Sequence, residues 1–171
     1  MHSKLKLILL PIAVVVLLGG ILLYFAINGQ PKTVASYEQA KQAMENRGFT
    51  PIDSTDIFKE SWGNNSAILD KAISFEQGEQ KMHFFVLTSD KAAQSIRASY
   101  WSYLRYDSGR FGSSGSNQEY KSSISNYTVS WVKTKDYFTV CTRVGNTVIY
   151  AEADADANKQ ICAIIEELGY D

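Results

Sequence analysis

The sequence predicts an α+β domain, with an antiparallel sheet made of a hairpin plus a three-stranded meander and helices packed on one face, preceded by one transmembrane helix. Runs of β-forming residues are joined by turns of two or three residues, which allow only antiparallel neighbours. Other segments repeat apolar residues at helical spacing. Helices that cover one face of an antiparallel sheet define the α+β class.

The chain opens with an apolar segment at residues 7–27 that carries no charge. At about 1.5 Å per residue, this segment spans roughly 30 Å, the thickness of the hydrocarbon core of a bilayer. Lys4 and Lys6 precede it, and positively charged flanks stay in the cytoplasm. We therefore expect residues 1–6 in the cytoplasm, residues 7–27 in the cell membrane as a single-pass anchor, and the domain outside. Secretion after cleavage at Ala35 is the alternative.

A linker at residues 28–35 and an extracytoplasmic domain at residues 36–171 follow the apolar segment. The spacing Ser36-x-x-Gln39 is a capping box and predicts the start of a helix. Gly48 supplies the left-handed conformation with which many helices end.

Residues 50–69 predict only a short strand or a helical turn. Residues 72–76 and 81–87 are rich in β-formers around the turn at 77–79, which predicts a hairpin. Ser89 caps a second helix. The apolar stripe of that helix consists of Ala93, Ile96, Tyr100 and Leu104.

Residues 107–119 are rich in glycine and serine, so we expect them to lack regular structure. Strands are then predicted at residues 122–133, 137–144 and 147–153. A last helix is expected to begin near Asp154 or Asp156 and to end at Gly169. Its apolar stripe consists of Ala157, Ile161, Ile164 and Leu168.

Two cysteines lie in the domain, and outside the cytoplasm such a pair can form a disulfide. Cys141 alternates with the apolar residues of its strand and so points away from the core face. Cys162 lies at the flank of the last helix. Parity therefore argues against pairing, although the sequence leaves a disulfide open.

Composition argues against a nucleic-acid partner. The chain has 17 basic and 18 acidic residues, and Lys4 and Lys6 lie before the apolar segment. The remainder therefore carries a small acidic excess, whereas nucleic-acid-binding domains show a basic face.

The sequence contains no recognisable catalytic set. His83 is the one histidine of the domain, on a strand, and no serine occupies a strained strand-to-helix turn beside it. The run from Asp154 to Asn158 opens like a calcium loop, but Lys159 replaces the required glycine and Ile165 the required glutamate. We therefore expect no metal and no cofactor, and interpret these acidic residues as helix caps.

One candidate surface for a partner lies on the second helix and the residues that follow it. Arg97, Trp101 and Arg105 are spaced four residues apart and share a helical face. Aromatic rings and guanidinium groups can bind an envelope polymer or a protein. Alternatively, Trp101 packs on the rim of the sheet with the arginines beside it. The surface continues through Tyr106, Arg110 and Phe111.

The chain resembles a group of small bacterial surface proteins, anchored by a helix or a lipid, to which no activity is assigned. The resemblance rests on Gly48-Phe49-Thr50, Phe84-Phe85-Val86-Leu87, Asn126-Tyr127, the run from Arg143 to Tyr150, and Leu168-Gly169-Tyr170. It implies an extracytoplasmic location and a fold, and it supplies no catalytic residues.

These observations favour a membrane-tethered interaction or sensing module without catalytic activity. The alternatives are a cell-envelope hydrolase or accessory enzyme, and a structural subunit whose transmembrane helix pairs with another. The ligand, the partner, the biological process and the oligomeric state are not predicted by the sequence.

Overall fold

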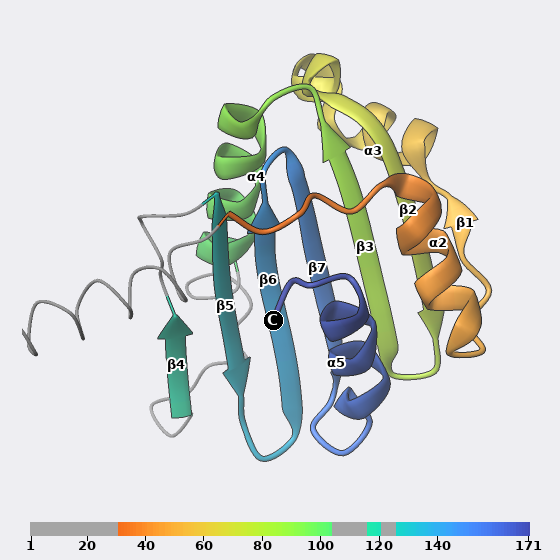
Figure 1. Ribbon diagram of the computed structural model, residues 1–171, viewed down its shortest axis with the longest axis vertical. Helices are drawn as coiled ribbons and strands as arrows, with labels where there is room; N and C mark the ends of the chain where they lie inside the picture. Colours follow the sequence, from red (N-terminus) through yellow and green to blue (C-terminus); the bar gives the residue numbers. More distant parts are fainter. Residues whose placement is uncertain (1–30, 104–115, 121–125) are drawn as a thin grey trace, which may run out of the picture. The chain divides into compact units, whose positions relative to one another are not determined.

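An antiparallel sheet of seven strands organises the domain, in the order β1-β2-β3-β7-β6-β5-β4 (Figure 1). The computed structural model describes residues 31–103, 116–120 and 126–171. The strands are β1 (Ile52–Asp53), β2 (Leu69–Gln77), β3 (Gln80–Leu87), β4 (Ser116–Tyr120), β5 (Tyr127–Lys133), β6 (Tyr137–Val144) and β7 (Thr147–Asp154).

The predicted hairpin and meander are confirmed as β2–β3 and β5–β6–β7. The two units join where β3 pairs with β7, an arrangement that the sequence did not predict. The expectation that residues 107–119 lack regular structure is wrong at its end, because β4 begins at Ser116 and pairs with β5. A partner strand at the sheet edge supplies the hydrogen bonds that local composition does not favour.

The helices are α2 (Tyr37–Asn46), α3 (Thr55–Trp62), the 3₁₀ helix η1 (Gly63–Ile68), α4 (Asp90–Ser102) and α5 (Asn158–Glu167). Their predicted caps are largely confirmed. Ser36 and Gln39 form the capping box, the Ser89 hydroxyl accepts from the backbone of α4, and Gly48 and Gly169 have positive φ. The predicted start of α5 near Asp154 or Asp156 is too early, because β7 extends to Asp154 and pairs there with β6. The interpretation of the acidic residues as helix caps is also wrong, because the N-cap is Ala157 and no side chain caps this helix.

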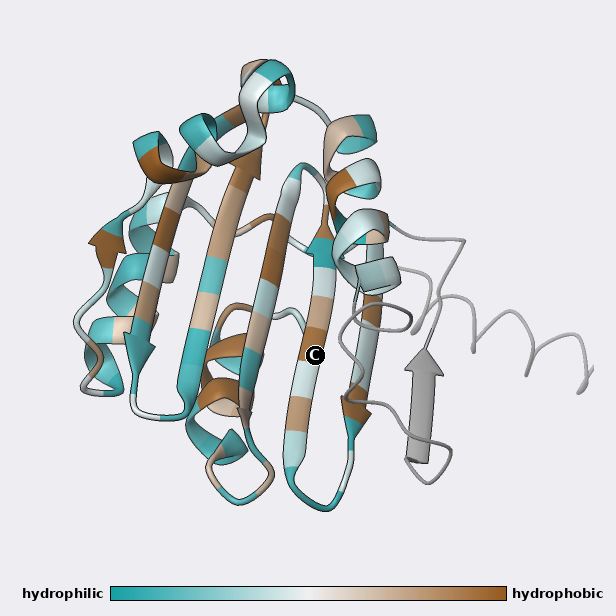
Figure 2. Ribbon diagram, turned by 180° about the vertical axis from the view of Figure 1, so that it is seen from behind, coloured by the Kyte–Doolittle hydropathy of each residue, from teal (hydrophilic) through white to brown (hydrophobic). Residues whose placement is uncertain are grey.

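The prediction that helices cover one face of the sheet is wrong, because they cover both. Helices α2 and α5 pack on one face, whereas α3, η1 and α4 pack on the other (Figures 1 and 2). Phe84 and Phe85 are neighbours on β3 that point to opposite faces, and both are fully buried. Strands buried on both faces carry nearly continuous apolar or small residues. Such a run does not show from the sequence that two layers of helices cover the sheet.

The two cysteines are free. Cys141 is buried in the core cluster under α4, and Cys162 is exposed on α5, which packs on the opposite face. Strand parity therefore predicts correctly that Cys141 lies on the opposite face from its apolar neighbours, but that face is itself a core face and not a surface away from the core.

Residues that the sequence assigns to the linker contact the sheet. The Asn126 side chain accepts from the backbone N–H of Lys32 at 2.8 Å and donates to its carbonyl at 2.9 Å. The Lys32 ammonium donates to the carbonyl of Asp171, and the Ala35 N–H donates to the Tyr170 hydroxyl. We call residues 32–35 the strap, and the compact unit of the domain begins with it at Lys32.

Within the described part of the chain, no helix is long and apolar enough to cross a membrane. The predicted span at residues 7–27 lies outside the described residues.

Gly145→Ala is expected to destabilise the domain more than Gly78→Ala. Both glycines have positive φ, so any side chain strains the backbone at either position. At Gly145 the added Cβ also lies 2.6 Å from Cγ2 of Val34 in the strap, whereas at Gly78 nothing lies within 4 Å. Urea unfolding should show an excess cost of roughly 1–3 kcal/mol for Gly145→Ala. Adding Val34→Ala should remove most of that excess, and equal costs at the two glycines would contradict the contact.

Candidate binding groove

A groove opens between α4 and the segment formed by α3 and η1, on the face of the sheet opposite α5. Figure 2 shows these helices lying over the upper part of that face. The groove has a volume of about 530 Å³. Its lining residues are Ser61, Trp62, Asn65, Ile96, Ser99, Tyr100 and Tyr103. None of these residues carries a charge at neutral pH, and three are aromatic.

Two of the aromatic rings are held by contacts with rings of the core. The ring centroid of Trp62, at the end of α3, lies 5.4 Å from that of Phe85. The ring centroid of Tyr100, on α4, lies 5.7 Å from the centroid of Phe85 and 4.7 Å from the centroid of Tyr150. Burial raises the pKa of Tyr100 to about 12, so its hydroxyl stays neutral. The third ring, Tyr103, is 52% exposed.

A chain of hydrogen bonds lies in the sheet beside this aromatic cluster. The Ser54 and Ser74 hydroxyls are 2.8 Å apart, and Ser74 Oγ is 2.8 Å from Nδ1 of His83. Ser74 and His83 are direct partners on β2 and β3, and Ser54 precedes α3. If Ser54 donates to Ser74 and Ser74 donates to His83, both hydroxyl protons have a partner. This direction makes Nδ1 the acceptor and places the imidazole proton on Nε2.

An ion pair lies next to His83. Lys81 Nζ is 2.9 Å from Oε2 of Glu152, and the Tyr150 hydroxyl donates to Oε1 of the same carboxylate. The His83 ring is parallel to the Tyr150 ring at 6.0 Å between centroids. Burial and the nearby Lys81 ammonium lower the pKa of His83 to about 4, although Glu152 opposes the shift. His83 is therefore neutral at pH 7.

This polar cluster is poorly suited to catalysis. A histidine with a pKa of about 4 is a weak base at neutral pH. Ser74 is only 7% exposed, and neither Ser74 nor His83 lines the groove. Across the described ranges 31–103 and 126–171, no group of three or more metal-ligating side chains occurs. The cluster instead ties α3 and the aromatic rings to the sheet.

The structure describes only two residues, Arg97 and Trp101, of the candidate surface predicted from the sequence. Arg97 and Trp101 do lie together, with the guanidinium carbon 5.5 Å from the indole ring centre. Each is only 8% exposed, because this face of α4 packs on the sheet, where Arg97 donates to the Ser130 hydroxyl. Arg105, Tyr106, Arg110 and Phe111 lie outside the described residues. A partner for the six-residue surface remains a prediction.

The groove was missed because its residues were assigned other roles. The sequence places Ile96 and Tyr100 in the core stripe of the second helix, and it predicts only a short strand or a helical turn for residues 50–69, which contain Trp62. The spacing of Ile96, Tyr100 and Tyr103 already indicates an aromatic face beside the one that contains Arg97.

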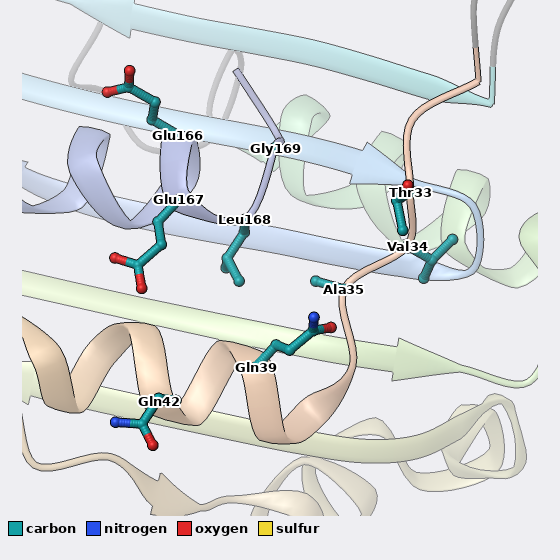
Figure 3. Close-up of a pocket in the computed structure, with 9 residues that line it drawn as sticks. All are labelled: Thr33, Val34, Ala35, Gln39, Gln42, Glu166, Glu167, Leu168 and Gly169. Carbon is teal, nitrogen blue, oxygen red and sulfur yellow. The ribbon is translucent and has the colours of Figure 1, made fainter.

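A second hollow, of about 420 Å³, lies between the strap, α2 and the end of α5 (Figure 3). Glu167 is its most engaged polar side chain, since it accepts from Arg47 at 3.0 Å and from Asn46 at 3.2 Å. These bonds join α2 to α5. Because they already use the carboxylate, the second hollow is a weaker candidate for a ligand site than the groove.

Comparisons with known proteins assign no family. No family model matches the chain, and no curated protein matches it. Among solved structures, the extracellular domain of PknH from Mycobacterium tuberculosis is similar at a TM-score of 0.39. The two share 10% sequence identity, and the match covers 83% of this chain and 99% of that chain.

Acidification is expected to destabilise the wild-type domain more than a His83→Gln variant. The neutral imidazole is favoured in the fold, since its pKa falls from 6.5 to about 4. The corresponding stability is present above pH 6.5 and is lost as the pH falls toward 4, to a total of roughly 3 kcal/mol. Urea unfolding of both proteins from pH 7 to pH 4.5 measures the difference. A difference that stays constant with pH would contradict a lowered pKa.

Trp101→Ala should lower the free energy of unfolding by about 3–5 kcal/mol, because a buried indole leaves a cavity. Tyr103→Ala is the matched variant two residues further on, and its exposed ring should cost less than about 0.5 kcal/mol. Urea titration followed by circular dichroism measures both. Similar costs for the two variants would show that Trp101 does not pack on the sheet.

Proposed function

We propose that this protein is a non-catalytic interaction or sensing module, tethered by residues 7–27 at the outer face of the cell membrane, and that the groove is its binding surface. The observation that carries the proposal is an open, aromatic concavity whose described lining is uncharged and in which Trp62 and Tyr100 pack on Phe85 of the core. Its volume falls within the range of roughly 300–1,000 Å³ that is common for ligand sites.

The aromatic lining supports binding on energetic grounds. Trp and Tyr bury large surfaces and lose few rotatable bonds when a ligand covers them. Trp62 and Tyr100 are already held by Phe85, so little further ordering is required. The described residues of the groove also lack the cations that a nucleic-acid backbone requires, which supports a different class of partner.

A cell-envelope hydrolase or accessory enzyme is the second candidate, and the hydrogen bond between Ser74 and His83 favours it. A serine nucleophile needs a base that is effective near neutral pH and a substrate that can reach its hydroxyl. The low pKa of His83 and the burial of Ser74 supply neither. The binding module is therefore the proposal that the geometry supports better.

Site-specific photocrosslinking in intact cells tests the proposal. Benzophenone in place of Tyr103, at the groove, should capture a partner, because it inserts into C–H bonds of any molecule bound there. The matched control replaces Ile52 on β1, which is similarly exposed at 55% against 52% but lies outside the groove. The expected result is a crosslinked product, identified by mass spectrometry, at position 103 alone. Equal labelling at the two positions, or none at either, would contradict the proposal.

A further inference from the structure

We infer that the ligand of the groove is a neutral carbohydrate segment. This inference rests on the proposed function and adds the chemical class of the ligand. A pyranose ring presents a face of C–H groups that stacks on an aromatic ring, and an edge of hydroxyl groups that need hydrogen-bond partners. The groove offers both kinds of surface, from two different elements.

The stacking surface is formed by Trp62 and Tyr100, with Tyr103 exposed one turn further along α4. Tyr100 and Tyr103 are three residues apart, so their rings lie on neighbouring positions of one helical face. Such a row suits a ligand with repeated rings. Both inner rings pack on Phe85, which keeps the stacking surface in place before a ligand arrives.

The hydrogen-bonding groups surround these rings. Ser61 and Asn65 lie on the wall formed by α3 and η1, and Ser99 lies on the α4 wall. All three are exposed. Hydroxyl and amide side chains both donate and accept, as sugar hydroxyls do.

The described part of the groove lining has no charged side chain, and this property distinguishes between classes of ligand. An anionic polymer would need Arg or Lys in the groove, and a cationic one would need Asp or Glu. Interfaces with proteins use Trp and Tyr as anchors too, but they typically place Arg beside them among the residues that dominate affinity, with a polar rim. Among the residues that the structure describes, the lining of this groove contains none of the four charged types. A neutral polyhydroxylated ligand matches the lining better than a charged polymer or a protein.

Calorimetric titration of the full chain in lipid nanodiscs tests the inference, since nanodiscs avoid detergents with sugar headgroups. The probes are cellotetraose and chitotetraose, which are neutral, and tetragalacturonate, which has the same number of rings and is anionic. We expect at least one neutral tetrasaccharide to bind and the anionic one to bind about tenfold more weakly or not at all. No binding of either neutral probe, or tighter binding of the anionic one, would overturn the inference.

Variants locate the binding in the groove. Tyr103→Ala should leave the fold intact, because its ring is half exposed. It should weaken binding about tenfold, whereas Ile52→Ala should leave binding unchanged. Trp62→Ala should abolish binding, and Trp131→Ala, which removes an indole that packs on the opposite core cluster, should not. Near-ultraviolet circular dichroism checks that each variant is folded. Equal effects of Tyr103→Ala and Ile52→Ala would overturn the assignment to the groove.

The two proposals fail in different ways. A protein crosslinked at position 103, together with no binding of any tetrasaccharide, would overturn the carbohydrate inference and leave the binding module standing. The absence of crosslinks at position 103, together with no binding of any tetrasaccharide, would overturn both.

Discussion

The burial of both faces of the central strands is the constraint on which the rest of the domain depends. Phe84 and Phe85 follow one another on β3, point to opposite faces and are both removed from water. Burying a phenylalanine side chain stabilises a fold by roughly 1.5–3 kcal/mol, a large share of the net stability of a small domain. One helical layer cannot cover both rings. The sheet therefore needs α2 and α5 on one side and α3, η1 and α4 on the other.

Local sequence signals predict the structure well where the chain satisfies its own backbone groups. The Ser36 and Ser89 caps, the Gly48 and Gly169 ends and the short turns of the meander all act within a few residues of themselves. These local signals fail where pairing with a strand distant in the sequence determines the secondary structure. Residues 116–120 form β4 because β5 offers a ladder, and β7 extends to Asp154 because β6 continues beside it. No local propensity contains that information.

The same reasoning explains why the site was harder to predict than the fold. Helix α4 contacts the sheet through Ala93, Arg97 and Trp101, and it faces the groove through the adjacent row that contains Tyr100 and Tyr103. Sequence periodicity merges two neighbouring contact faces into one broad stripe. If helices covered only one face of the sheet, Arg97 and Trp101 would have to lie on the surface. Because a second layer of helices covers the other face, both residues can pack on the sheet.

The second layer also determines how firmly the walls of the groove, the proposed binding surface, are held. One wall carries Tyr100, whose ring packs at a tilt against Tyr150, and the Tyr150 ring is in turn parallel to the His83 ring. The other wall is α3, and Ser54 at its start is hydrogen-bonded through Ser74 to the same histidine. Both walls are thus connected to one buried polar cluster, so a displacement of either wall would break contacts in the core. A groove held in this way should select ligands that fit its existing shape, since it gains affinity by losing little side-chain freedom on binding.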